Sequence, residues 1–393
     1  MEQPGQRQDF ARRIARSFLR DGEPFAIRNA RKVDARGVRD HAWVVSDGES
    51  LVAVGTSDDD CETACRNLNI PDTAVMDASG AIMTPGYVDI RAHGAWGASF
   101  DDGVEGIELA RAGHLSHGTT RQVLSLITNP FDTICDNLRT IRGQTDMRSD
   151  ILGVHLEGPF LAASRKGAHN PECLCDPVDG LVDDILRAVD GCLRQITIAP
   201  ELPRGISAIR RFADAGIMTH MFNAMNGLHH RRSGPIPAAV EDPRVTIELI
   251  NDGFHVSDPI VKLGFGFAPH RIAFVTDAMA ATGCPDGRYL LGALDVDVVD
   301  GHARLMSNGA IAGSTLVLEQ AVRRAVLRLG ISAPDAVEAA TLTPARAFGY
   351  DKPNRVTGRP LGLLAPGYAA DVLLLDPEDW AVRHVWCDGH AVR

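Results

Sequence analysis

Four polar residues follow apolar runs of the chain at four separate places: His93, Glu157, His220 and Asp277. The runs before them are short and rich in Val, Ile and Leu, a pattern typical of buried strands, and a Gly-Pro pair directly after Glu157 ends its strand in a turn. In an α/β barrel the carboxyl ends of all strands meet at one face, where the chemistry of such barrels takes place. We therefore expect these four side chains to lie close together.

Imidazole and carboxylate groups are the ligands of a zinc-type cation in a catalytic site, which keeps one position for water. Such an ion lowers the pKa of water to about 7, and a neighbouring aspartate can take the proton and pass it to a leaving amine. Each of the four residues alone has a simpler interpretation as a structural polar group. Their occurrence at the ends of four predicted strands favours a metal-assisted hydrolytic site.

A second group of residues predicts a pocket for an anion. Asn223 and Ala224 follow His220 closely, and Arg231 lies a short loop later in the stretch HHRRSG. Backbone amides and a forked guanidinium suit a phosphate group. The alternative for HHRRSG is an exposed basic loop, and His255 either contacts a substrate or simply packs.

The middle of the chain alternates predicted strands and helices, which indicates a TIM-like α/β barrel. Both ends are β-rich instead, and they predict one small β domain built from both termini. We expect an N-terminal extension at 1–24, the small domain at 25–84 together with 355–393, and the barrel at 85–354. The predicted barrel strands lie at 88–90, 119–127, 151–157, 195–200, 217–221, 245–250 and 272–276.

Composition limits the classes of partner. A net charge of -11 argues against a general nucleic-acid surface, and no run of about 18 apolar residues predicts a membrane span. The eight cysteines are scattered, so we expect reduced thiols in a cytoplasmic protein. Residues 1–23 could form an amphipathic helix with Phe10, Ile14 and Phe18 on one side; we expect a solvated extension, with a partner-binding or targeting helix as the alternative.

Eight motifs occur in one order: PGYVDIRAHG, HLEGPFL with KGAHN, TIAPE, THMFNAM, DGFHV, VTDAMAATG, AGSTL and ATLTPARA. From about residue 25 onwards the chain therefore resembles the N-acetylglucosamine-6-phosphate deacetylases of the amidohydrolase superfamily. The resemblance implies a metal-dependent barrel of the amidohydrolase type with a small β-sandwich-like domain, in a homodimer. It also implies hydrolysis of N-acetylglucosamine 6-phosphate, a phosphosugar, to glucosamine 6-phosphate and acetate in amino-sugar catabolism.

The resemblance also implies roles for individual residues. Glu157 and His220 match metal ligands of the family, His93 is a candidate third ligand, and Asp277 matches the catalytic acid–base. The implied cofactor is one divalent metal ion, zinc in the first place, with iron, manganese or cobalt as alternatives. The residues that match substrate contacts are Ala168, Asn223, Ala224, Arg231, His255, Ile311, Ala312 and Gly313.

Two departures from the family pattern stand out. After the first strand the family often has His-x-His, or a variant that lacks both histidines, whereas this chain has Arg91 and His93 and so keeps one histidine. Between TIAPE and THMFNAM the family has a strand ending in a Gly-His-Ser or Gly-His-Thr ligand motif, whereas residues 201–220 hold one predicted helix, at 206–215, and one strand. We therefore expect seven barrel units, weak metal binding and deacetylase activity below that of relatives. The alternatives are a non-catalytic phosphosugar-binding relative and an amidohydrolase that acts on another amide, such as a cyclic one.

Overall fold

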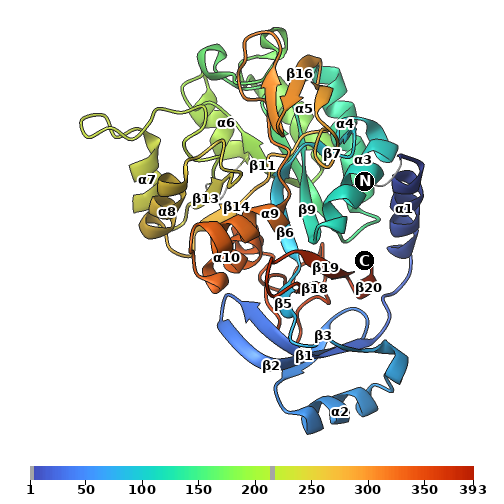
Figure 1. The fold of residues 1–393 in the computed structure, drawn as a ribbon. Coiled ribbons are helices and arrows are strands. Elements are labelled where there is room, and N and C mark those ends of the chain that lie inside the picture. Colours follow the sequence, from blue (N-terminus) through green and yellow to red (C-terminus); the bar gives the residue numbers. More distant parts are fainter. Residues whose placement is uncertain (1–3, 213–216) are drawn as a thin grey trace.

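The computed structural model describes residues 4–212 and 217–393, and its centre is a barrel of parallel strands wrapped by helices (Figure 1). Within the described residues seven strands line the barrel, in agreement with the predicted units: β6 (Tyr87–Ala92), β9 (Thr119–Leu126), β10 (Ile151–Glu157), β11 (Leu193–Thr197), β12 (Ile217–Met218), β13 (Thr246–Leu249) and β14 (Ile272–Phe274).

Helices alternate with these strands along the chain, and the spacing of their apolar residues explains how they pack. In α5 the residues Val182, Ile185 and Val189 are buried at helical spacing, and Asp190 ends the helix in the left-handed conformation with φ of 39°. The outer helices are α3 (Gly103–Ser116), α4 (Phe131–Thr145), α5 (Asp179–Val189), α6 (Gly205–Phe212), α7 (Pro235–Glu241), α8 (Asp258–Phe267), α9 (Leu318–Arg323), α10 (Ala333–Ala340) and α11 (Leu342–Ala347). The end of the helix predicted at 206–215 falls on residues 213–215, outside the described residues.

The barrel strands form two hydrogen-bonded sheets. One runs β6-β9-β10-β11 and the other β12-β13-β14. They join where β14 meets β6, since the amide of Asp277 donates to the carbonyl of Arg91 (3.0 Å) and that of His93 to the carbonyl of Ala278 (2.7 Å). Between β11 and β12, in contrast, the described part of the chain has no hydrogen-bonded ladder. We call β11 and β12 together the seam of the barrel.

Strands from both ends of the chain share one further sheet, in the order β20-β19-β18-β5-β1-β2-β3 with β4 beside β1. β2 and β3 are antiparallel neighbours and form a hairpin. The domain boundaries expected from the sequence remain a proposal. The sheet supports it because strands from both ends of the chain share it. Its strands are β1 (Phe25–Asp34), β2 (Gly37–Ser46), β3 (Leu51–Gly55), β4 (Val75–Asp77), β5 (Ile82–Pro85), β18 (Val372–Leu375), β19 (Val382–Cys387) and β20 (His390–Ala391), and α2 (Asp58–Asn67) lies against β2 and β3.

The N-terminal segment corrects one expectation. Helix α1 (Pro4–Ser17) is not a solvated extension, because it packs against α3 on the outside of the barrel (Figure 1). Ile14 is 2% exposed, the ring of Phe10 meets that of Trp96 edge to face at 6.0 Å, and Arg7 donates to the carbonyl of Gly283. The apolar side of the predicted amphipathic helix is thus used within the chain.

A small antiparallel sheet follows the last barrel strand and was not expected from the sequence. It comprises β15 (Gly287–Leu291), β16 (Leu294–Val299) and β17 (His302–Leu305), and it packs through Val296 and Leu305 in one apolar cluster with Ile127 and Met279 near the strand ends. A short hairpin of β7 (Gly94–Ala95) and β8 (Ala98–Ser99) follows β6.

Among the described residues, no helix combines the length and the apolar character needed to cross a membrane.

Candidate active site

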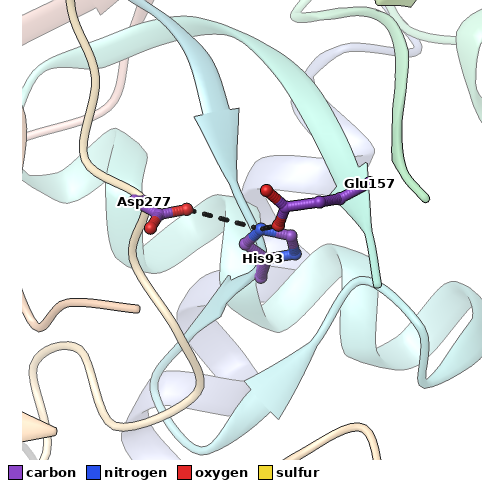
Figure 2. Close-up of side chains that lie close together, drawn as sticks. All are labelled: His93, Glu157 and Asp277. Atoms are coloured by element: carbon purple, nitrogen blue, oxygen red, sulfur yellow. Dashed lines mark ion pairs between the residues drawn. The ribbon is translucent and has the colours of Figure 1, made fainter. Parts of the chain in front are cut away.

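The ends of the barrel strands bring the four predicted residues together. His93 follows β6, Glu157 is the last residue of β10, His220 follows β12 and Asp277 follows β14. Figure 2 shows His93 between the two carboxylates: its Nε2 lies 3.2 Å from Glu157 Oε2 and 3.5 Å from Asp277 Oδ1. Nε2 of His220 lies 3.7 Å from Glu157 Oε1.

Burial and neighbouring charges shift the pKa values of the acids and of His93 in opposite directions. Burial opposes ionisation of Glu157, but Arg91 and hydrogen bonds from His220 and His93 outweigh it and hold the pKa of Glu157 well below its usual value. Burial likewise opposes the charge of Asp277, and its hydrogen bond with His93 still lowers its pKa. For His93, burial lowers the pKa, but Asp277 and Glu157 raise it more, to about 9. Without a metal the group thus favours an imidazolium between two carboxylates.

Arg91 is the cation that neutralises the interior of the barrel beside this group. Its side chain is fully buried, with Nη1 2.6 Å from Glu157 Oε1 and Nε 2.9 Å from Glu248 Oε2. Nη2 donates to Thr197 Oγ1 at 2.9 Å. A buried charge is tolerated only when it is paired in this way.

The donor set fits one divalent ion. His93 Nε2 and carboxylate oxygens of Glu157 and Asp277 all lie within 4.8 Å of one another, which is the spacing that ligands around a single ion require. Glu157 Oε1 is engaged by Arg91, so Oε2 is the oxygen that faces His93. His220 Nε2 faces the other oxygen, Oε1, and lies outside this group of three. Imidazole and carboxylate groups are the ligand types that a zinc-type ion takes in a catalytic site.

Three residues at this face have strained backbones. His220, Ala224 and Asp277 have φ of 30°, 51° and 51°, in the left-handed region that non-glycine residues rarely adopt. Such strain costs of order 1–3 kcal/mol per residue and concentrates at functional sites, where the surrounding fold must hold it. The turns after β12 and β14 are therefore shaped to point these residues inward.

A cavity of about 940 Å³ opens above the four residues. Its size is typical of small-molecule sites. It also contains two cations that the sequence analysis did not single out, Arg165 and Lys166. Of the predicted substrate contacts, six line this cavity: Ala168, Asn223, Ala224, His255, Ile311 and Gly313.

Two predicted substrate contacts do not line the cavity. Ala312 is fully buried, packed in the cluster beneath the small antiparallel sheet. Arg231 is exposed in the loop that leads into α7, and this loop projects away from the barrel (Figure 1). The structure therefore does not bring Arg231 to the other predicted residues.

Sequence reasoning missed Glu248 and His155, which lie inside the barrel. Glu248 is fully buried and bonded to Arg91 and Gln195, and His155 bonds to Ser125 and Thr197. A signal for Glu248 exists in the sequence: it stands between Ile247 and Leu249 in a predicted strand, where a carboxylate is unusual.

Comparisons with known proteins agree with this geometry. A family model described as the amidohydrolase family matches residues 82–392. N-acetylgalactosamine-6-phosphate deacetylase from Escherichia coli O157:H7 is 32% identical over 344 residues, which cover 80% of this chain and 89% of the relative. N-acetylglucosamine-6-phosphate deacetylase from Danio rerio is 28% identical over 355 residues, with 81% and 86% covered.

A solved structure also superposes closely. A mutant of N-acetyl-D-glucosamine-6-phosphate deacetylase from Mycobacterium smegmatis, in complex with N-acetyl-D-glucosamine-6-phosphate, gives a TM-score of 0.84 at 34% identity and covers 94% of this chain and 100% of that chain. The barrel, the convergent donor set and the extent of these matches lead to one conclusion: the chain belongs to the amidohydrolase family.

Proposed function

We propose that this protein hydrolyses the N-acetyl amide of N-acetylglucosamine 6-phosphate to glucosamine 6-phosphate and acetate. The observation that carries the proposal is the group of His93, Glu157 and Asp277 at the base of a cavity of about 940 Å³. The relatives and the solved structure named above act on or bind 6-phosphorylated N-acetyl amino sugars, which supports this substrate class.

The side chains take complementary roles in this proposal. Glu157, His220 and His93 would hold a divalent ion, which would supply Lewis-acid chemistry towards the acetamide carbonyl and water. Asp277 accepts the proton of the attacking water at its carboxylate and delivers it to the amide nitrogen as the C–N bond breaks. The water oxygen ends in acetate and the proton on the amine. Zinc is the proposed metal, with iron, manganese or cobalt as alternatives.

The remaining predicted residues would hold the sugar. Asn223, Ala224 and His255 lie on the cavity wall with Ala168, Ile311 and Gly313, while Ala312 supports that wall from behind. We propose Arg231 as the phosphate contact, which requires its loop to fold over the cavity when substrate binds. Lys166, at the cavity wall, adds positive charge nearby.

The test is acetate release from N-acetylglucosamine 6-phosphate, with N-acetylgalactosamine 6-phosphate and unphosphorylated N-acetylglucosamine as parallel substrates. We expect metal-dependent release from the phosphorylated glucosamine derivative, at a rate below that of relatives because a ligand strand of the family has no counterpart. If the protein preferred N-acetylgalactosamine 6-phosphate, the proposed substrate would change but the proposed reaction, amide hydrolysis, would stand. Binding of the phosphosugar without acetate release, in the metal-loaded protein, would identify a non-catalytic relative instead.

Cellular context and assembly belong to the same proposal. All eight cysteines are free, which supports a reducing compartment such as the cytoplasm. The homodimer implied by the resemblance stays a prediction, and light scattering of the purified protein measures it.

A further inference from the structure

The interior of the barrel contains a buried arginine that links carboxylates on two strands. Arg91, on β6, is fully buried and contacts Glu157 at the end of β10 through Nη1 and Glu248 in β13 through Nε, at 2.6 and 2.9 Å. The two carboxylates stand on different sheets of the barrel. One guanidinium therefore bridges both halves of the barrel.

The same network spans the seam. Arg91 Nη2 donates to Thr197 at the end of β11, and the Gln195 side chain of β11 donates to Glu248 Oε1 at 2.7 Å. On the other side, the amide of His220, directly after β12, donates to Glu248 Oε2 at 3.1 Å. Side-chain bonds through Arg91 and Glu248 thus connect β11 and β12 where the backbone ladder is missing among the described residues.

We propose that Arg91 is a positioning residue that acts as a fixed internal cation. It holds Glu157 so that Oε2 alone faces His93 and Asp277, it excludes a second divalent ion from the space between Glu157 and Glu248, and it closes the seam.

Physical chemistry supports each part of this role. A guanidinium presents several donors in a rigid plane, so it can bond to Glu157, Glu248 and Thr197 at once. A second ion between the two glutamates would have to compete for the same oxygens and would be repelled by the adjacent positive charge at short range. Unlike a metal ion, the guanidinium is covalently attached and cannot be removed by a chelator.

This inference rests on the proposed function only in that one divalent ion binds at Glu157, His220 and His93. Its tests measure metal stoichiometry and amide exchange and need no substrate. Failure of the deacetylase assay would therefore leave them interpretable.

The first experiment is a zinc titration of the purified chain after removal of metal, in which elemental analysis measures bound and free zinc at equilibrium across a dialysis membrane. We expect about one zinc ion per chain in the wild type even at excess zinc, and about one in Arg91→Lys, which keeps the charge. In Arg91→His, which places an imidazole two residues before His93, we expect about two. Two ions in the wild type, or one ion in a folded Arg91→His, would overturn the proposed exclusion.

The second experiment is hydrogen exchange of the metal-free protein, followed by mass spectrometry. Arg91→Lys keeps the positive charge but loses the planar set of guanidinium donors. We therefore expect amide exchange in β11 and β12 to become at least ~10-fold faster, while the exchange rate in β9 changes little. Glu248→Gln should speed exchange in the same two strands and keep the one-ion stoichiometry, which secures the test if an Arg91 variant fails to fold.

A matched control is Arg111, another fully buried arginine, which pairs with Asp150 away from the site. Arg111→Lys should lower the unfolding temperature without speeding exchange selectively in β11 and β12 and without changing the number of zinc ions. If Arg111→Lys and Arg91→Lys gave the same exchange pattern, Arg91 would have only a general structural role and the proposal would be wrong.

Discussion

Two parts of the barrel are built differently. In β9 and β10 every residue is buried, and each strand pairs with a neighbour on both sides. In β11 only Gln195 is buried, and both residues of β12 are partly exposed. The first part, with β6, is the closed half of the barrel, and the second is the seam.

The difference shows how a barrel can close by two kinds of interaction. In the closed half, backbone ladders and apolar packing hold the strands and depend little on any single side chain. At the seam, bonds from Gln195, Thr197 and Glu248 replace part of the ladder, and each depends on residue identity. At the seam, substitutions should therefore lower stability mainly by removing hydrogen bonds. In the closed half, they should lower stability mainly by removing apolar volume.

The largest expected effect concerns Asp277, which follows β14, the strand that meets β6 of the closed half. Because its amide is held by the carbonyl of Arg91, the site should keep its shape when the side chain changes. Asp277→Asn should lower kcat by ~10²–10⁴-fold, about 3–5 kcal/mol, with metal still bound. Steady-state kinetics and metal analysis measure this, with Asp295→Asn on the exposed face of β16 as the control. Near-normal turnover would remove Asp277 from the proton-transfer role.

The next prediction tests the comparison directly with two leucines. Leu124 in β9 is fully buried, whereas Leu193 in β11 is partly exposed. Leu124→Ala should lower the free energy of unfolding by about 3 kcal/mol because it leaves a cavity, and Leu193→Ala by about 1 kcal/mol. Denaturant unfolding of the metal-free variants gives both values. Equal losses would mean that the seam is packed as tightly as the closed half.

The sequence predicts the fold well because the barrel signal is local and repeated. Short apolar runs with polar ends, such as the one before Glu157, repeat along the chain, and residues 201–220 are too few for two helices and two strands. The small sheet of β15, β16 and β17 escaped prediction. Burial alternates along its short strands, but the apolar side chains that point inward pack onto residues distant in the chain, such as Ile127, and no local pattern indicates that contact.

The candidate site is only partly predictable for a related reason. Residue type and strand position indicate Glu157 and Asp277. The ion-pair partner of Arg91, in contrast, depends on how the barrel strands come together in three dimensions. Glu248 lies 157 residues away along the chain, and no local pattern indicates that these two side chains meet. The position of Arg231 depends on the conformation of a loop, which the sequence pattern around HHRRSG does not determine.

A smaller effect is expected from His114, in α3 beside the closed half. Burial, with Arg111 nearby, lowers the pKa of His114 to about 3, so the folded chain keeps this imidazole neutral. The unfolded chain binds a proton below about pH 6.5, and stability therefore falls as the pH drops from about 6.5 towards 3. Between pH 7.5 and 5 the loss should be about 2 kcal/mol.

Urea unfolding of the wild type and His114→Gln at several pH values measures this contribution. The substituted chain has no titrating group at this position, so its free energy of unfolding should fall less between pH 7.5 and 5. Parallel pH profiles for the two proteins would show that the imidazole of His114 does not titrate differently in the folded and unfolded chains.

The smallest expected effect tests whether the phosphate of the substrate contacts the loop of the closed half or the loop beyond the seam. Lys166 comes from the loop after β10 in the closed half and already donates to the carbonyl of His169, whereas Arg231 comes from the loop beyond the seam and is exposed. If that loop folds over bound substrate, Arg231→Ala should lower kcat/KM for N-acetylglucosamine 6-phosphate by ~5–10-fold, about 1 kcal/mol, and leave the unphosphorylated sugar unchanged. Arg232→Ala, one residue along the same loop, is the matched control and should change neither value. Equal losses on both sugars would show that Arg231 is not a phosphate contact. A selective loss in Lys166→Ala alone would assign the phosphate contact to the closed half.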